Sequence, residues 1–150
     1  MVQPIPDEYR RITPYICVRD GNAAIAFYEQ AFGATRKMVL PAGDRVMHAE
    51  VVIGDSVLML SDEFPEMGQV APAGTGPISS HLMLYVEDVD AVTERAVRLG
   101  ATLVDPPTDQ FYGDRTSRIV DPQGHTWTLG THVKDVSDEE MMAAMAAMPQ

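Results

Sequence analysis

The sequence predicts an α+β protein built from two tandem modules, each a strand, a helix and three further strands. A strand-turn-helix pattern occurs twice, and short alternating apolar segments separated by turn residues follow each copy. The chain has 150 residues, of which 45% are hydrophobic. This is enough to bury a core in one compact domain or in two small fused modules.

The first copy of the pattern occupies residues 15–34, YICVRDGNAAIAFYEQAFGA. The apolar run that begins at Tyr15 predicts a short strand, and a Val-x-Asp turn follows it. Apolar residues then recur at helical spacing as far as Phe32, and Gly33 is expected to end the helix.

The second copy occupies residues 82–101, LMLYVEDVDAVTERAVRLGA. Val18 corresponds to Val86 at an offset of 68 residues, and Gly33 corresponds to Gly100 at an offset of 67. A register that stays this constant indicates an internal duplication.

Strand patterns follow each helix. Residues 46–61 contain Gly54-Asp55 at the centre of a predicted two-residue hairpin loop, and residues 115–132 turn at positions 121–124. The intervening segment is rich in Pro and Gly and lacks periodicity, which indicates a linker or a lid. We expect module 1 at about residues 9–63, a linker at 64–76 and module 2 at about 77–133, all within one domain of residues 1–133.

Residues 134–150 are expected to form a C-terminal helix or tail. Ser137 and Glu140 have the spacing of a capping box. Met141, Met145 and Met148 fall on one stripe of the helix, which predicts packing against the same domain or a partner subunit.

The charge balance limits the classes of partner. With 22 acidic and 11 basic residues, the formal net charge of -11 disfavours nucleic acids and anionic membranes, so the expected partner is a small organic molecule. The one cysteine, Cys17, excludes an intramolecular disulfide. The chain begins without a secretory pattern and contains no apolar run of about 18 residues, so we expect a cytoplasmic protein.

Several motifs resemble those of the vicinal oxygen chelate superfamily, which includes glyoxalase I, bleomycin-resistance and fosfomycin-resistance proteins and extradiol dioxygenases. These motifs are AFYEQAFGA in the first helix and DPQGHTW in the last hairpin, within the duplicated unit. The resemblance covers roughly residues 9–133. HAEVVIGDSVLML, LYVEDVDAV, QFYGDR and the acidic tail look like the PhnB-like branch in particular.

The resemblance implies that each module curls its sheet into half of a shared cleft, and that metal-dependent members place four ligands on the strands lining it. Counted from the motifs, these positions fall on Thr13, Met59, His81 and Thr128. Only His81 is a ligand of the usual kind, and a catalytic metal needs about three protein ligands. We therefore expect no metal cofactor.

Side chains alternate across a strand, so residues of one parity share a face. If Thr128 marks the cleft face, Thr126 and His132 lie on it, whereas His125 and Trp127 face the helices. The DPQGHTW segment is then mainly a hairpin, with Trp127 in the core and His125 satisfied beside the turn.

The same alternation, counted from the Gly54-Asp55 loop, places His48, Glu50 and Met59 on the cleft face. His48 and Glu50 with His81 would form a two-histidine, one-carboxylate set for a divalent metal, displaced from the usual site. A hydrogen-bonded His48–Glu50 pair without metal explains the same residues. Both alternatives stay open.

The remaining cleft-facing candidates describe an aromatic and thioether pocket for a planar or amphipathic ligand. Arg115 either holds an anionic group of that ligand or forms a surface ion pair with Asp114 or Asp109. Cys17 is expected to be a small buried residue rather than a nucleophile. These candidates are Tyr15, Cys17, Met83, Tyr85, Arg115 and Ser117.

Two functions follow. The first is a non-catalytic binding protein of the bleomycin-resistance type, in which a homodimer shelters an organic, antibiotic-like or aromatic compound. The second is a lyase, isomerase or dioxygenase-like enzyme that uses the displaced metal set, or His48 as a metal-free base oriented by Glu50.

Overall fold

The computed structural model describes residues 1–74 and 76–150, which contain two four-stranded sheets and three α-helices. The chain divides into two compact units. The first unit comprises Met1–Gly76 with Pro122–His125, and the second comprises Pro77–Asp121 with Thr126–Gln150. None of the described helices is long and apolar enough to cross a bilayer.

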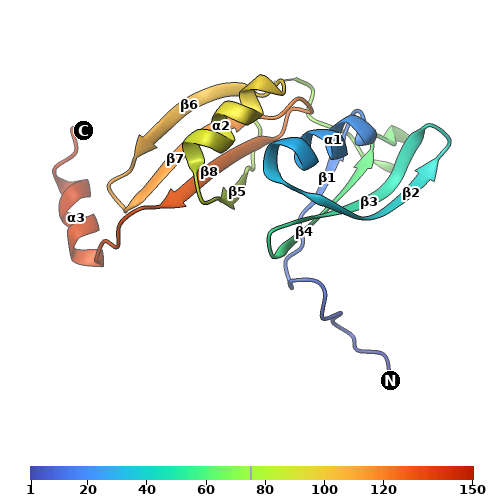
Figure 1. Ribbon diagram of the computed structural model, residues 1–150, viewed down its shortest axis with the longest axis horizontal. Coiled ribbons are helices and arrows are strands. Elements are labelled where there is room, and N and C mark those ends of the chain that lie inside the picture. Colours follow the sequence, from blue (N-terminus) through green and yellow to red (C-terminus); the bar gives the residue numbers. More distant parts are fainter. Residues whose placement is uncertain (75) are drawn as a thin grey trace. The chain divides into compact units, whose positions relative to one another are not determined.

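In the first unit, helix α1 lies against one face of a sheet with strand order β1-β4-β3-β2 (Figure 1). Strands β1 and β4 are parallel, and the other neighbouring strands are antiparallel. A short 3-10 helix follows the sheet at Pro65–Met67. The main elements are β1 (Tyr15–Val18), α1 (Gly21–Phe32), β2 (Thr35–Ala42), β3 (Arg45–Ile53) and β4 (Ser56–Asp62).

The second unit repeats this arrangement, with helix α2 against a sheet of order β5-β8-β7-β6 and with β5 parallel to β8. The predicted duplication and α+β fold class are therefore confirmed. The elements are β5 (Leu82–Tyr85), α2 (Val89–Arg98), β6 (Thr102–Asp109), β7 (Asp114–Val120), β8 (Thr126–His132) and the C-terminal α3 (Asp138–Ala146).

The duplication extends to the way each main helix begins. The Asp20 carboxylate accepts a hydrogen bond from the backbone N–H of Ala23 at 3.0 Å, and Asp88 accepts one from Ala91 at 3.0 Å. These aspartates satisfy backbone donors that have no partner within the helix, which explains the Val-x-Asp turn in both copies of the pattern.

Helix α1 is joined to the sheet at its first residue. Asp62, at the end of β4, accepts hydrogen bonds from the backbone N–H groups of Gly21 at 2.9 Å and Val46 at 2.5 Å. A Cβ added to Gly21 would lie 2.7 Å from Cβ of Val46. Glycine therefore permits the close approach of the helix to strand β3.

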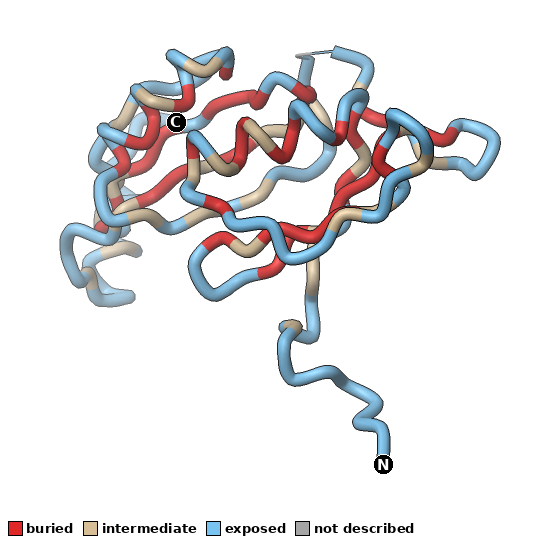
Figure 2. The backbone as a smooth tube through the Cα atoms, turned by 45° about the vertical axis from the view of Figure 1, so that its right-hand side comes forward, coloured by how far each residue is buried: buried red, intermediate tan, exposed pale blue. Residues whose placement is uncertain are grey.

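The core of each unit lies between its helix and its sheet, and the buried positions follow these elements along the tube in Figure 2. The opposite side of each sheet, which we call the open face, carries polar and partly exposed side chains. In the first unit the open face includes Tyr15, Cys17, His48, Glu50 and Met59. In the second it includes Met83, Tyr85, Thr116, Arg118 and Thr128.

The two predicted hairpins are present. Gly54 adopts a φ of 58° in its loop, and Glu50 pairs with Met59 in the expected register. Trp127 is 3% exposed and donates its indole N–H to Asp121 at 2.9 Å. Nε2 of His125 lies 2.7 Å from the carbonyl oxygen of Cys17. The interpretation of DPQGHTW as a structural hairpin is confirmed.

The C-terminal helix α3 begins with the predicted capping box of Ser137 and Glu140. No residue of the helix is buried, and Met145 is 62% exposed. Met145 and Met148 are accessible in the single chain, and the packing predicted for the methionine stripe, against the same domain or a partner subunit, stays a prediction.

Candidate functional site

The open face of the first unit carries a hydrogen-bonded network made of Tyr9, Tyr15, His48 and Glu50, which we call the His48 network. Nδ1 of His48 lies 3.0 Å from the hydroxyl of Tyr15, and Nε2 lies 3.0 Å from Oε1 of Glu50. The hydroxyl of Tyr9 donates to Oε2 of Glu50 at 2.6 Å. Strand alternation on β3 and the parallel pairing of β1 with β4 bring Tyr15, His48 and Glu50 to one face of the sheet.

Glu50 is only 4% exposed, yet its carboxylate is held in the charged form. Burial raises the pKa of this group, but the hydrogen bonds from Tyr9 and His48 outweigh burial and hold it below its ordinary value. The same hydrogen bond to Glu50 raises the pKa of the Tyr9 phenol. Glu50 therefore accepts from both neighbours.

Tyr9 was missed by the sequence reasoning. It lies in the segment before β1, which has no regular secondary structure, so no strand or helix periodicity marks its position. The side chain is also covered by the Lys37 ammonium group, whose nitrogen lies 4.8 Å from the centre of the ring.

A cavity of about 700 Å³ adjoins this network in the same unit. Tyr9 belongs to both, and Met59 links them because it pairs with Tyr15 on β1 and with Glu50 on β3. The walls combine apolar side chains with two guanidinium groups. The lining residues are Pro4, Ile5, Pro6, Tyr9, Arg10, Arg11, Thr13 and Met59.

Thr13 and Cys17 hold local structural contacts. The Thr13 hydroxyl donates to the carbonyl of Arg10 at 2.8 Å, and Sγ of Cys17 lies 3.7 Å from the carbonyl of Asp62. Burial and the negative charges of Glu63 and Asp62 raise the pKa of the Cys17 thiol. The thiol is therefore kept protonated, which argues against a nucleophilic role.

The open face of the second unit has a smaller cavity of about 510 Å³. Arg118 lies directly opposite Thr128 in the β7–β8 register, and its guanidinium approaches the carboxylate of Asp105 at 3.5 Å. Sequence reasoning did not select Arg118 or Thr116. The lining residues include His81, Met83, Thr108, Thr116, Arg118 and Thr128.

Tyr85 and His132 meet at a buried carboxylate, that of Asp114. The Tyr85 hydroxyl donates to one oxygen at 2.7 Å, and Nδ1 of His132 lies 2.8 Å from the other. Burial raises the pKa of Asp114, but these two hydrogen bonds hold it below its ordinary value. Nε2 of His132 lies 2.8 Å from Asp135, so both ring nitrogens face carboxylates.

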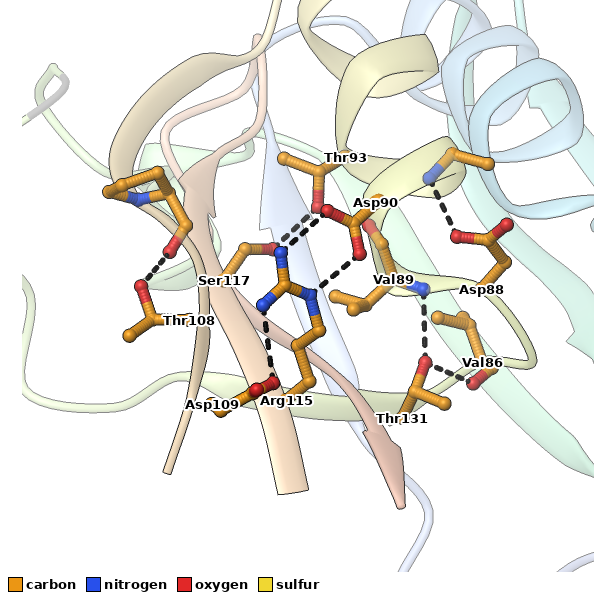
Figure 3. Close-up of polar contacts among 12 residues, drawn as sticks. Val86, Asp88, Val89, Asp90, Thr93, Thr108, Asp109, Arg115, Ser117 and Thr131 are labelled. Carbon is orange, nitrogen blue, oxygen red and sulfur yellow. Dashed lines mark hydrogen bonds and ion pairs between the residues drawn. The ribbon is translucent and has the colours of Figure 1, made fainter. Parts of the chain in front are cut away.

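The predicted placement of the Arg115 and Ser117 side chains on the cleft face was wrong, whereas the alternative prediction of an ion pair between Arg115 and Asp109 is confirmed at 3.2 Å. Figure 3 shows Arg115 bound to Asp90 and Asp109, and Ser117 beside Thr93. Asp90 and Thr93 belong to helix α2, so both predicted residues lie on the helix side of the sheet. Thr126, by contrast, lies two residues before Thr128 on β8, so both point to the same face of the sheet as predicted. Thr126 pairs with Val120 of β7.

The four positions that the family uses for metal ligands do not fit a catalytic divalent ion here. They provide two threonine hydroxyls, one thioether and one imidazole, whereas zinc and iron sites use nitrogen, carboxylate or thiolate ligands. No group of three or more His, Cys, Asp or Glu in the described parts of the chain is arranged to hold a metal. The displaced set of His48, Glu50 and His81 remains a prediction, since His81 lies in the second unit.

Comparisons with known proteins agree with this fold. The model of the glyoxalase/bleomycin resistance protein/dioxygenase superfamily matches residues 10–129. The uncharacterized protein Rv0887c of Mycobacterium tuberculosis H37Rv is 38% identical over 140 residues, which cover 91% of this chain and 82% of that protein.

Two solved structures share the fold. TioX from Micromonospora sp. ML1 is 25% identical with a TM-score of 0.65, and the match covers 83% of this chain and 99% of TioX. A family enzyme from Burkholderia phytofirmans PsJN is 22% identical with a TM-score of 0.66, covering 79% of this chain and 95% of that one. The chain therefore belongs to the glyoxalase/bleomycin resistance protein/dioxygenase superfamily.

Proposed function

We propose that this protein binds a small organic molecule, aromatic or antibiotic-like and carrying an anionic group, on the open face of its first unit. The observation that carries the proposal is the cavity of about 700 Å³ formed by Ile5, Tyr9, Met59 and two arginines. Its volume lies within the range of about 300–1,000 Å³ that small-molecule sites occupy. Apolar walls suit a ring system, and Arg11 suits a carboxylate, whereas Arg10 already approaches the carboxylate of Asp55 at 3.4 Å.

We further propose that binding requires no divalent metal. The donor set at the family's ligand positions supports this, because only His81 among Thr13, Met59, His81 and Thr128 is a usual ligand. The motifs quoted for the PhnB-like branch support placing the chain in that branch. We also propose that the protein is cytoplasmic and forms a homodimer. The homodimer is proposed because a second copy of the chain can cover the edges of the two sheets.

Calorimetry with 2-naphthoate tests the anionic site, and 2-naphthamide serves as the uncharged control ligand. We expect naphthoate to bind more tightly than the amide. We expect Met59→Glu to abolish naphthoate binding, because the new carboxylate in the cavity wall would repel the carboxylate of the ligand. Lys134→Ala is the control variant, since Lys134 belongs to the other unit and lines neither of the cavities described. Equal affinity for acid and amide, or unchanged affinity in Met59→Glu, would contradict the proposed site.

The second candidate is an enzyme that transfers protons without metal. The His48 network favours it, because a buried carboxylate that orients an imidazole is a common arrangement for general base catalysis. Exchange of ligand C–H hydrogens with deuterated solvent, followed by NMR, separates an enzyme from a binding protein.

A further inference from the structure

We propose that the hydroxyl oxygen of Tyr15, and not His48 itself, accepts a proton from a compound bound on the open face of the first unit. His48 then acts through Tyr15, because its Nδ1 takes up the proton that the Tyr15 hydroxyl releases. The inference rests on the proposed ligand-binding function, and it adds the atom that meets the ligand and the chemical class of that ligand.

The directions of the hydrogen bonds follow from Glu50. Its carboxylate has no proton to give, so Nε2 of His48 carries the hydrogen that bridges the 3.0 Å to Oε1. A neutral imidazole has one donor and one acceptor, which leaves Nδ1 of His48 as an acceptor. The Tyr15 hydroxyl therefore donates to Nδ1 across 3.0 Å, and the lone pairs of its oxygen remain available.

Solvent exposure decreases from Tyr15 to His48 to Glu50. Tyr15 is 47% exposed, the His48 side chain is 23% exposed, and Glu50 is buried. The acceptor nitrogen of His48 is already occupied by Tyr15. A ligand that approaches the open face consequently meets the phenol oxygen of Tyr15 first.

The proton-transfer step is balanced within these groups. The ligand's proton passes to the Tyr15 oxygen while the original Tyr15 proton passes to Nδ1 of His48, which becomes an imidazolium. The carboxylate of Glu50 stabilises that positive charge, and the bonding electron pair stays on the ligand. Reversal of the two transfers returns the proton, so no oxidant or other reactant is needed.

The neighbours of Tyr15 indicate the ligand class. Met59 pairs directly with Tyr15 and also forms part of the cavity wall, so the cavity reaches the strand position next to Tyr15. The compounds that fit are aromatic carbon acids or phenols with an electron-withdrawing group.

The probe for this proposal is 5-nitrobenzisoxazole, whose ring opens to a coloured phenolate when a base removes its C–H proton and the N–O bond breaks. We expect the protein to accelerate ring opening over matched buffer, and Tyr15→Phe and His48→Gln each to lower the rate by about a hundredfold. His125→Gln is the matched histidine control and should keep the rate. Unfolding curves identify any variant that fails to fold. In that case Glu50→Gln is the substitute variant, because it replaces the buried carboxylate behind His48 with a neutral amide.

The solvent isotope effect distinguishes transfer through Tyr15 from direct abstraction by His48. Transfer through Tyr15 moves an exchangeable O–H proton, so the rate should fall in D₂O, whereas direct abstraction moves only the probe's C–H proton. No acceleration by the intact protein, full activity in Tyr15→Phe, or an unchanged rate in D₂O would each overturn the proposal. Naphthoate binding is measured on the same samples, so loss of the site and loss of the proton transfer are told apart.

Discussion

The guanidinium of Arg115 forms a two-pronged ion pair with the carboxylate of Asp90, with Nε 2.7 Å from Oδ2 and Nη2 2.9 Å from Oδ1 (Figure 3). This pair joins strand β7 to the first turn of helix α2. It lowers the pKa of Asp90 and raises that of Arg115. The anion-binding capacity of Arg115 is thus already used within the fold.

Arg115→Ala should lower the midpoint of thermal unfolding without weakening naphthoate binding. The bidentate geometry makes this ion pair stronger than an ordinary surface pair, although salt screens it. Arg98→Ala, which removes an i,i+4 pair with Glu94 within the same helix, is the control and should have a smaller effect. Differential scanning fluorimetry at low and high salt measures both. A loss of ligand affinity with unchanged stability would restore the predicted ligand role of Arg115.

Gly21→Ala should destabilise the first unit by about 1–3 kcal/mol, because the new methyl group would overlap Val46. Gly74→Ala is the matched control, since no atom lies within 4 Å of a Cβ added there. Urea unfolding gives the free energies. The double variant Gly21→Ala, Val46→Ala should recover part of the loss, and equal stability of Gly21→Ala and wild type would contradict the close packing.

Periodicity and turn residues predicted most of the fold, because the alternation of side chains and the Gly54-Asp55 loop fix the β3–β4 register. The faces of β7 were predicted wrongly for a local reason. Five residues, 121–125, separate the paired Val120 and Thr126, so even-numbered residues of both strands share the open face. This parity selects Arg118 instead of Arg115. Tyr9 escaped prediction because irregular segments carry no such alternation.

The stability contributed by His132 should decrease as the pH rises. Its hydrogen bonds to Asp135 and Asp114 raise its pKa above the ordinary value of 6.5. A raised folded-state pKa means that the contribution is fully present below the unfolded-state pKa and is lost as the pH rises through the folded-state pKa. Asp114, with a lowered pKa, has the opposite dependence and loses its contribution as the pH falls through its folded-state value.

Urea unfolding of the wild type and His132→Gln, compared between about pH 5 and about pH 9, measures this dependence. The difference in unfolding free energy should be largest at the acidic end and should shrink towards the alkaline end. His81→Gln is the control, because His81 is exposed to solvent. A difference that grows with pH would contradict the assignment.

Light scattering at micromolar concentration should give twice the mass of one 16.4 kDa chain. Strands β2 and β6 lie at sheet edges, and the methionine stripe of α3 is exposed, so a second copy has both backbone and apolar surface to cover. Met145→Glu should shift the protein towards the monomer if α3 contributes to that contact. A monomer mass for the wild type would end the dimer proposal.

Chelator treatment should leave naphthoate affinity unchanged, because Thr13, Met59 and Thr128 replace three of the four ligands that metal-dependent relatives use. His81 alone lacks the partners that a divalent ion needs. His81→Ala should leave naphthoate affinity unchanged, because His81 belongs to the second unit and lines the other cavity. Calorimetry with nickel, iron, zinc and manganese provides the counter-test. Tight metal binding that disappears together with naphthoate binding in His48→Ala, Glu50→Ala and His81→Ala would establish the displaced site and make a metal-dependent enzyme the better interpretation.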